Sequence, residues 1–357
     1  MTGGGVEHVV MNYAKHVDHS RVIFDFIITE NSTVIPREEM EADGGRVFVV
    51  PPYKNLPAFE SALFELFKAH PEWKIVHSHM NALSVFPLKQ AKRAGVPVRI
   101  AHSHSSFGRG EPVRNAAKIV LKRFANTYPT NRFACSRRAG DWLFGEGTPY
   151  EIVYNAIELN RFFFTAEARA QARADLCLVG GEFVVGHVGR FMQTKNQEFL
   201  VDAFARLLEQ RPDSVLCFAG TGETEASVES SAAERGIADH VKFLGQRDDA
   251  NRLYQAFDAF ALPSLYEGLC LVGVEAQAAG LPCVLSDRIT HEVDLTHRCK
   301  FIPIDDPQRW ADALAAIAPR SDTERSSVDH GEFSDYDIKK QGAWLTNRYL
   351  QLYEEAR

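Results

Sequence analysis

The chain has 357 residues, of which 45% are hydrophobic and 24% are charged, and its formal net charge is −7. This length is too great for one ordinary core and the composition is that of a globular protein, which excludes a single small domain and a disordered chain. No apolar run approaches the roughly 18 residues that cross a bilayer, and the start does not resemble a signal peptide, so we expect a cytoplasmic protein.

Residues 1–160 hold 19 Lys and Arg against 16 Asp and Glu, and the remainder holds 21 against 31. The basic first half favours an anionic partner, such as a lipid-linked diphosphate or a membrane face, and we expect no nucleic acid.

A glycine-rich turn that includes Gly4 and Gly5 opens the chain and leads into an amphipathic helix that ends near Asp18. Because glycine permits close approach of the backbone to a ligand, both are candidate binding positions. A turn followed by a helix is the second half of a βα unit, and no strand precedes this one. We therefore expect that the printed start lies within a longer reading frame or that the chain is truncated.

Strands then alternate with helices. The periodicity predicts strands over 22–29, 46–50, 74–79, 97–104 and 132–136, and helices over 58–69, 82–94 and 113–126. This alternation is typical of a doubly wound parallel sheet. The segment 31–43 is polar and is predicted as a surface loop. The helix over 113–126 carries a basic stripe (Arg114, Lys118, Lys122) opposite residues expected inward, among them Val120 and Phe124, and its basic face is either solvated or a contact for a membrane or lipid diphosphate.

Two His-x-His sequences, His77–His79 and His102–His104, end two of the predicted strands. The period of two places both histidines of a pair on one side. No third or fourth ligand is apparent in the sequence, so we predict no metal at either pair. Asp335 and Asp337 also have a metal-binding spacing, but they lie at the start of the last predicted helix, over 336–355, and are interpreted as caps.

In the second half, a helical and loop segment over 165–181 is predicted as a linker, and a buried strand follows over 183–190. Arg190 ends this strand and Lys195 precedes a periodic helix, so both cations lie where a phosphate could bind. The next strand, over 214–220, exits through Gly220 and Gly222, a turn consistent with a nucleotide lying close to the backbone. Gln246 follows the strand over 241–245.

A stretch with two carboxylates lies between predicted strands over 258–262 and 282–287. Glu267 precedes Gly268, and Glu275 falls within the helix that starts near Leu269. The helix N-terminus directs unpaired N–H groups of Gly268, Leu269, Cys270 and Leu271 towards a phosphate. Spacing alone leaves open that both glutamates are solvated acids at a helix end.

The Glu267-x7-Glu275 element, with the wording YEGL and VEAQAAGLPCVLSD around it, resembles family 4 of the retaining glycosyltransferases with the GT-B fold. It is most similar to the bacterial capsular and exopolysaccharide members. The resemblance implies two Rossmann-like domains that face each other across a cleft. The first, over 1–165 with the helix 336–357 packed on it, would bind the acceptor, and the second, over 182–335, would bind the nucleotide sugar.

The resemblance also implies roles for residues. Arg190 and Lys195 would neutralise the donor diphosphate, Glu275 would bind the ribose, and Glu267 would orient the sugar. Gln246 would lie where the family holds the base, and His102 or His104 would meet the acceptor side. No metal is implied, since the two cations and the helix dipole carry the phosphate charge.

We therefore predict a transferase that moves a sugar from a nucleotide diphosphate sugar, with UDP favoured, to a hydroxyl of a saccharide or lipid-linked saccharide. The enzyme would be cytoplasmic or peripheral at the membrane. Two alternatives stay open: a sugar-nucleotide epimerase or hydrolase on the same fold, and a non-catalytic partner that binds a nucleotide sugar beside another transferase.

Overall fold

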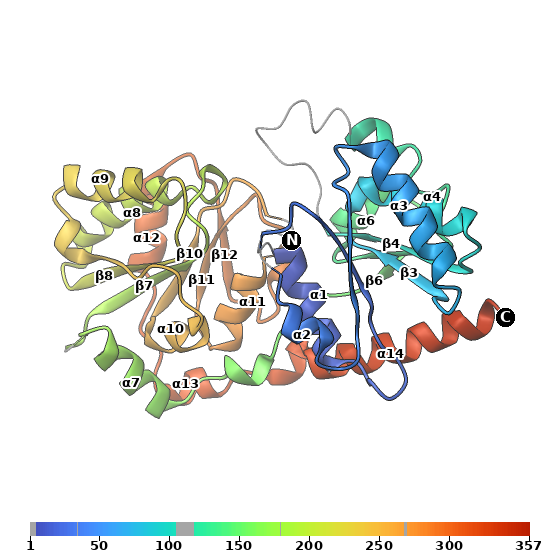
Figure 1. The fold of residues 1–357 in the computed structure, drawn as a ribbon. Helices are drawn as coiled ribbons and strands as arrows, with labels where there is room; N and C mark the ends of the chain where they lie inside the picture. The colour runs from blue at the N-terminus through green and yellow to red at the C-terminus, as the bar shows by residue number, and fades with distance from the viewer. Residues whose placement is uncertain (1–4, 34, 105–117, 179, 268–269) are drawn as a thin grey trace. The chain divides into compact units, whose positions relative to one another are not determined.

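A computed structural model describes residues 5–33, 35–104, 118–178, 180–267 and 270–357 of the chain, which divides into two compact units. Unit 1 contains Met1–Ile157 and Asp335–Arg357, and unit 2 contains Glu158–Ser334. Figure 1 shows that each unit is built from helices around parallel strands. None of the helices in these parts of the chain is long and apolar enough to cross a membrane.

Unit 2 is organised around a six-stranded parallel sheet with the order β12-β11-β10-β7-β8-β9. The strands are β7 (Phe183–Val188), β8 (Ser214–Ala219), β9 (Val241–Phe243), β10 (Ala259–Leu262), β11 (Cys283–Ser286) and β12 (Cys299–Ile302). The chain builds outward from β7 in one direction and, starting again at β10, in the other. This is the order of a dinucleotide-binding fold, in which ligands bind where the direction reverses. The reversal here lies between β7 and β10.

The helices of unit 2 cover both faces of this sheet (Figure 1). They are α7 (Ala166–Asp175), α8 (Gln197–Gln210), α9 (Glu225–Glu234), α10 (Ala250–Ala256), α11 (Leu271–Ala278), α12 (Pro307–Ala315) and α13 (Asp322–Ser326). A continuous core joins β7 and β8 to α8, α9 and α12, with Phe204, Phe218 and Trp310 fully buried. Because α7 packs on α10, the segment that we expected to be a linker is part of unit 2.

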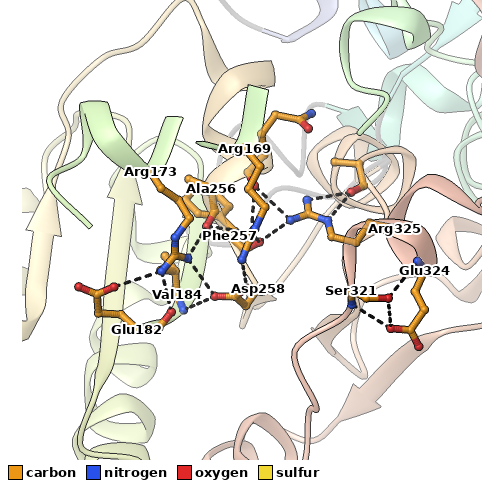
Figure 2. Close-up of polar contacts among 12 residues, drawn as sticks. Arg169, Arg173, Glu182, Val184, Ala256, Phe257, Asp258, Ser321, Glu324 and Arg325 are labelled. Atoms are coloured by element: carbon orange, nitrogen blue, oxygen red, sulfur yellow. Dashed lines mark hydrogen bonds and ion pairs between the residues drawn. The ribbon is translucent and has the colours of Figure 1, made fainter. Parts of the chain in front are cut away.

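Three arginines bind the carboxyl end of α10 (Figure 2). Arg325, which is 3% exposed, donates to the carbonyl oxygens of Tyr254 (2.9 Å), Gln255 (3.1 Å), Phe257 (2.9 Å) and Ala279 (2.9 Å). The last carbonyls of a helix have no partner within the helix. Arg325 therefore supplies the hydrogen bonds that the end of α10 lacks.

Asp258 provides the counter-charge for the other two arginines, as Figure 2 shows. Its carboxylate accepts from Arg169 at 2.6 Å and from Arg173 at 3.3 Å, and it also accepts from the backbone N–H of Val184 on β7 at 2.9 Å. This network fixes α10 to the sheet.

Unit 1 contains two separate parallel sheets, where we had expected one. β1 (Phe26–Thr29) pairs with β2 (Val47–Val50), and the four-stranded sheet has the order β3-β4-β5-β6. Its strands are β3 (Ile75–Ser78), β4 (Val98–Ser103), β5 (Asn131–Ala134) and β6 (Glu151–Ile152). The longer helices of this unit are α1 (Gly5–His16), α3 (Leu56–Ala69), α4 (Val85–Arg93), α6 (Arg137–Phe144) and α14 (Ile338–Glu355).

The helix α14 returns the chain to unit 1. Ile157 and Asp337 form an isolated parallel β-bridge: the Ile157 N–H donates to the Tyr336 carbonyl at 2.9 Å, and the Ile338 N–H donates to the Ile157 carbonyl at 3.0 Å. At Gly342 the helix lies so close to α1 that a Cβ would meet the His16 carbonyl oxygen at 2.3 Å. Asp337 accepts a hydrogen bond from the Lys339 N–H, which confirms its interpretation as a cap.

Two local predictions were wrong. The segment 31–43 contains the short helix α2 (Arg37–Glu41). Val120 and Phe124, expected inward, are 59% and 48% exposed. The polar segment 321–333 is helical over much of its length, because Ser321 and Glu324 form a capping box for α13 and Phe333 is fully buried.

Candidate active site

Two loops meet at the point where the strand order of unit 2 reverses. One follows β7 and contains the short 3-10 helix Gln193–Lys195, and the other follows β10. The N–H of Leu265 donates to the Thr194 carbonyl at 2.8 Å, and the Asn196 side chain donates to the Pro263 carbonyl at 3.3 Å. These bonds hold the two loops together at the carboxyl end of the sheet.

Lys195 and Glu267 form an ion pair between these loops. Lys195 Nζ lies 2.6 Å from Glu267 Oε1, and the Ser264 hydroxyl donates to the same oxygen at 2.6 Å. The side chains are 18% and 12% exposed, so the pair lies partly out of water, where charge interactions are stronger than in bulk solvent. The structure thus brings together two of the residues that the sequence singled out.

Arg190 lies at the start of the first loop with an exposed side chain. Among the residues that the structure describes, its guanidinium has no carboxylate partner. The neighbouring turn after β8 fixes the backbone here: a Cβ at Gly220 would lie 2.2 Å from the Gly189 oxygen, and one at Gly222 would lie 2.1 Å from the Phe191 oxygen. These two glycines, which we had assigned to nucleotide contact, therefore have a packing role that accounts for their small size.

Glu275 points from α11 to the neighbouring helix α10. Its Oε2 accepts a hydrogen bond from the Tyr254 hydroxyl at 2.8 Å. Loss of water around the carboxyl raises its pKa to about 7, against which the Tyr254 hydrogen bond acts in the opposite direction. Glu275 is thus a poorly solvated acid whose charge depends on pH near neutrality.

This raised pKa predicts a pH dependence of stability. Between the ordinary pKa of 4.5 and about 7 the folded protein keeps a proton that the unfolded chain releases, so the free energy of unfolding falls as the pH rises. The full loss across that window is about 3 kcal/mol. Urea unfolding of the parent protein and of Glu275→Gln at about pH 5 and about pH 8 measures this loss of unfolding free energy. Groups other than Glu275 titrate equally in both proteins, so the difference between the two proteins reports on Glu275 alone. Equal pH dependence in both proteins would contradict the assignment, and Glu234→Gln, an exposed change on α9, is the control.

The remaining predicted residues of the donor site lie in different settings. Gly4, Gly268 and Leu269 lie outside the described residues. Cys270 is buried directly before α11, and Leu271 is the first residue of that helix. Gln246 is exposed after β9, whereas Gly5 begins α1 in unit 1.

The histidines that we expected on the acceptor side belong to unit 1, where they form one cluster. β3 and β4 are adjacent and parallel, so the pairs at their carboxyl ends meet. His77 contacts His102 at 3.1 Å and His79 contacts His104 at 2.8 Å between ring nitrogens. The sequence does not show that the two pairs are neighbours, because they come together only through the pairing of β3 with β4.

Sequence reasoning missed two side chains that contact the glutamates predicted for the donor site. Ser264 orients Glu267 from three residues away, and Tyr254 binds Glu275 from another helix. The signal for Ser264 was its place at the end of a predicted buried strand. Nothing local marks Tyr254, which is a buried aromatic residue in a helix.

Models of known protein families match both halves of the chain. Residues 168–321 match the family described as glycosyl transferases group 1, and residues 4–156 match a glycosyl transferase 4-like domain. A protein of Bacillus subtilis (strain 168) that bears the name glycosyltransferase EpsF is 33% identical over 98% of this chain and 94% of its own length.

A second relative, from Escherichia coli, is 26% identical over 79% of this chain and 76% of its own length. It is named as a UDP-Gal:alpha-D-GlcNAc-diphosphoundecaprenol alpha-1,3-galactosyltransferase.

Solved structures share the fold. Anabaena Alr3699/HepE in complex with UDP-glucose aligns with a TM-score of 0.78 at 20% identity, over 98% of this chain and 96% of that one. Sucrose-phosphate synthase from Thermosynechococcus elongatus aligns with a TM-score of 0.75 at 20% identity, over 99% and 94%. The predicted α/β class and GT-B fold are confirmed. The chain belongs to the glycosyl transferases group 1 family and is a glycosyltransferase with the GT-B fold.

Proposed function

We propose that this enzyme transfers a sugar from a nucleotide diphosphate sugar, with a UDP-sugar as the favoured donor, to a hydroxyl acceptor with retention at the anomeric carbon. The observation that carries the proposal is the Lys195–Glu267 pair, held at 2.6 Å where the strand order of the sheet reverses. A cation and a carboxylate at that point suit the two ends of such a donor, the diphosphate and the sugar hydroxyls. The UDP-glucose complex of the structurally similar HepE supports the choice of donor class.

In this proposal, each charged residue of the donor site has one role. Lys195 and the exposed Arg190 stabilise the negative charge that develops on the diphosphate as the sugar–phosphate bond breaks. Glu267, oriented by Ser264, accepts hydrogen bonds from sugar hydroxyls. Glu275, positioned by Tyr254, accepts hydrogen bonds from the ribose.

The bond changes need no covalent intermediate with the protein. The bond between the anomeric carbon and the phosphate oxygen breaks, and the acceptor oxygen forms its bond to the same carbon from the same face. The acceptor proton passes to an oxygen of the leaving phosphate. Lys195 and Arg190 make this oxygen a better leaving group by holding its charge, and no metal is required for that task.

The acceptor is proposed to be a lipid-linked saccharide used in surface polysaccharide synthesis. The Escherichia coli relative is named for a diphosphoundecaprenol-linked substrate, and the name EpsF supports an exopolysaccharide product. Unit 1 exposes Ile119, Val120 and Phe124 beside Lys122, which supports peripheral contact with a membrane that holds such an acceptor.

Calorimetric titration with UDP-, GDP- and ADP-sugars tests the donor site. We expect saturable binding of one nucleotide class and an affinity at least about 10-fold lower in Glu275→Ala, because hydrogen bonds to a charged group are lost. Glu234→Ala is the matched control, with the affinity of the parent protein. Unchanged affinity in Glu275→Ala would remove this residue from the site.

A transfer assay separates the alternatives. Donor turnover that requires an acceptor supports the transferase, whereas turnover without one indicates an epimerase or hydrolase. Binding without any turnover would indicate a non-catalytic partner. Product stereochemistry, read from the anomeric coupling constant, decides whether configuration is retained.

A further inference from the structure

The four histidines of unit 1 form a compact group of imidazoles at the carboxyl ends of β3 and β4. The ring centroids of His102 and His104 are 4.0 Å apart, and those of His77 and His79 are 4.1 Å apart. His102 is 1% exposed and His104 is 5% exposed. Four such rings in one place are more than the acceptor-side role of a single histidine requires.

The hydrogen bonds within the group leave ring nitrogens unsatisfied. A neutral imidazole has one N–H and one bare nitrogen. His77 Nδ1 lies 2.6 Å from the Tyr349 hydroxyl and its Nε2 lies 3.1 Å from His102 Nδ1, so both of its nitrogens are used. Within the described part of the chain, the buried His102 Nε2 has no partner, and neither has His104 Nδ1. A buried polar atom without a partner costs about 1–3 kcal/mol, so the group is incomplete as a hydrogen-bonded network.

Histidine binds a metal through a ring nitrogen of its neutral imidazole. Neutral imidazole suits Zn²⁺, Cu²⁺ and Ni²⁺ among common ions.

The geometry fits a single ion. The candidate ligand atoms of His77, His79 and His102 all lie within 4.8 Å of one another. Two nitrogens bound to one tetrahedral Zn²⁺ at 2.0–2.1 Å are about 3.3 Å apart, and the His77–His102 contact is already 3.1 Å. The candidate ligand atom of His79 is within 4.8 Å of the other two, so ion binding requires a movement of the His79 side chain, whose Nδ1 now contacts His104 Nε2 at 2.8 Å. The Tyr349 hydroxyl on His77 Nδ1 provides the second contact that orients a ligating ring, and the ion would take the place of the contact between His77 Nε2 and His102 Nδ1.

We propose that His77, His79 and His102 form a binding site for a divalent transition metal, with Zn²⁺ as the preferred ion and His104 beside it. Three imidazole ligands leave one coordination position for water or a hydroxyl. The site belongs to unit 1, whereas Arg190, Lys195 and Glu275 belong to unit 2. Because all three ligands lie within one unit, the test of this site requires neither donor nor acceptor.

Equilibrium dialysis of the untagged, chelator-treated protein against micromolar Zn²⁺, followed by elemental analysis, tests the site. We expect about one equivalent of Zn²⁺ per chain and a loss of affinity of about 100-fold in His79→Gln. His240→Gln is the control with unchanged binding, because this histidine lies in unit 2 and contacts the Ser214 carbonyl. Less than about one tenth of an equivalent in the parent protein, or equal binding by His79→Gln, would overturn the proposal.

Cobalt substitution keeps the test decisive if the variant does not fold. Co²⁺ in the parent protein should give the visible absorption of a four-coordinate site, and X-ray absorption should show at least three imidazole ligands. A six-coordinate spectrum with oxygen ligands would show that the ion binds elsewhere and would exclude the histidine site. Circular dichroism shows whether each variant is folded. Zinc dialysis is compared for folded variants, and the cobalt spectrum of the parent protein decides where a variant is not folded.

Discussion

Replacement of Lys195 by methionine is expected to lower kcat for sugar transfer by about 10²–10³-fold, the loss seen when one group that stabilises developing charge is removed. Two effects combine. The leaving diphosphate loses a cation, and Glu267 loses the partner that holds its carboxylate at 2.6 Å. Because methionine retains the length of the side chain, the change removes the charge with little change in packing.

Steady-state kinetics with the best donor from the titration measures this prediction. The loss should fall mainly on kcat, since the charge that Lys195 meets is greatest in the transition state. Lys300→Met is the matched control, because Lys300 is exposed on the edge strand β12. A Lys195→Met enzyme within about threefold of the parent in kcat would show that the pair is structural.

Replacement of Arg325 by leucine is expected to reduce the free energy of unfolding of unit 2 by about 3–5 kcal/mol, the range for breaking a buried charged network. The guanidinium contacts four carbonyl oxygens and lies 4.2 Å from the Phe164 ring centroid. Leucine fills part of the space but supplies no donors, so the carbonyls at the end of α10 lose their partners in the interior. Burial lowers the pKa of Arg325 to about 9, so it is still charged near neutral pH.

Urea unfolding, followed by the fluorescence of the buried Trp310 in unit 2, measures this loss. Arg309→Leu is the control, because its ion pair with Asp305 is exposed at 3.6 Å and should contribute less than about 1 kcal/mol. The Arg325 variant should also bind the donor more weakly, since Tyr254 lies on the helix that Arg325 holds. Equal stability of Arg325→Leu and the parent would mean that solvent satisfies these carbonyls.

Local sequence patterns predicted much of the fold and one part of the site. The strands on either side of Glu267 and the helix that carries Glu275 are local features, set by runs of apolar residues and by glycine. Lys195 and Glu267 were expected near one edge of the sheet, because each lies in a connection that follows a predicted parallel strand, but the ion pair between them was not predicted.

The rest depends on contacts between distant segments. The histidine cluster exists only because β3 pairs with β4, and each His-x-His sequence alone indicates no site. Tyr254 reaches Glu275 across 21 positions, and Arg325 reaches the end of α10 from about 70 positions away. The segment around Arg325 is polar in sequence, yet the capping box of α13 and the buried Phe333 make it part of the core.

The place of α14 in unit 1 also determines the order in which the protein can mature on the ribosome. All of unit 2 is synthesised before Asp335, so it can fold before α14, the last helix of unit 1, has been made. Domains usually complete folding from the N-terminus during synthesis, and this connectivity reverses that order. The unit made first is thus the last to close, and until then its Tyr349 cannot reach His77. A nascent chain in this state exposes the face of α1 that α14 later covers.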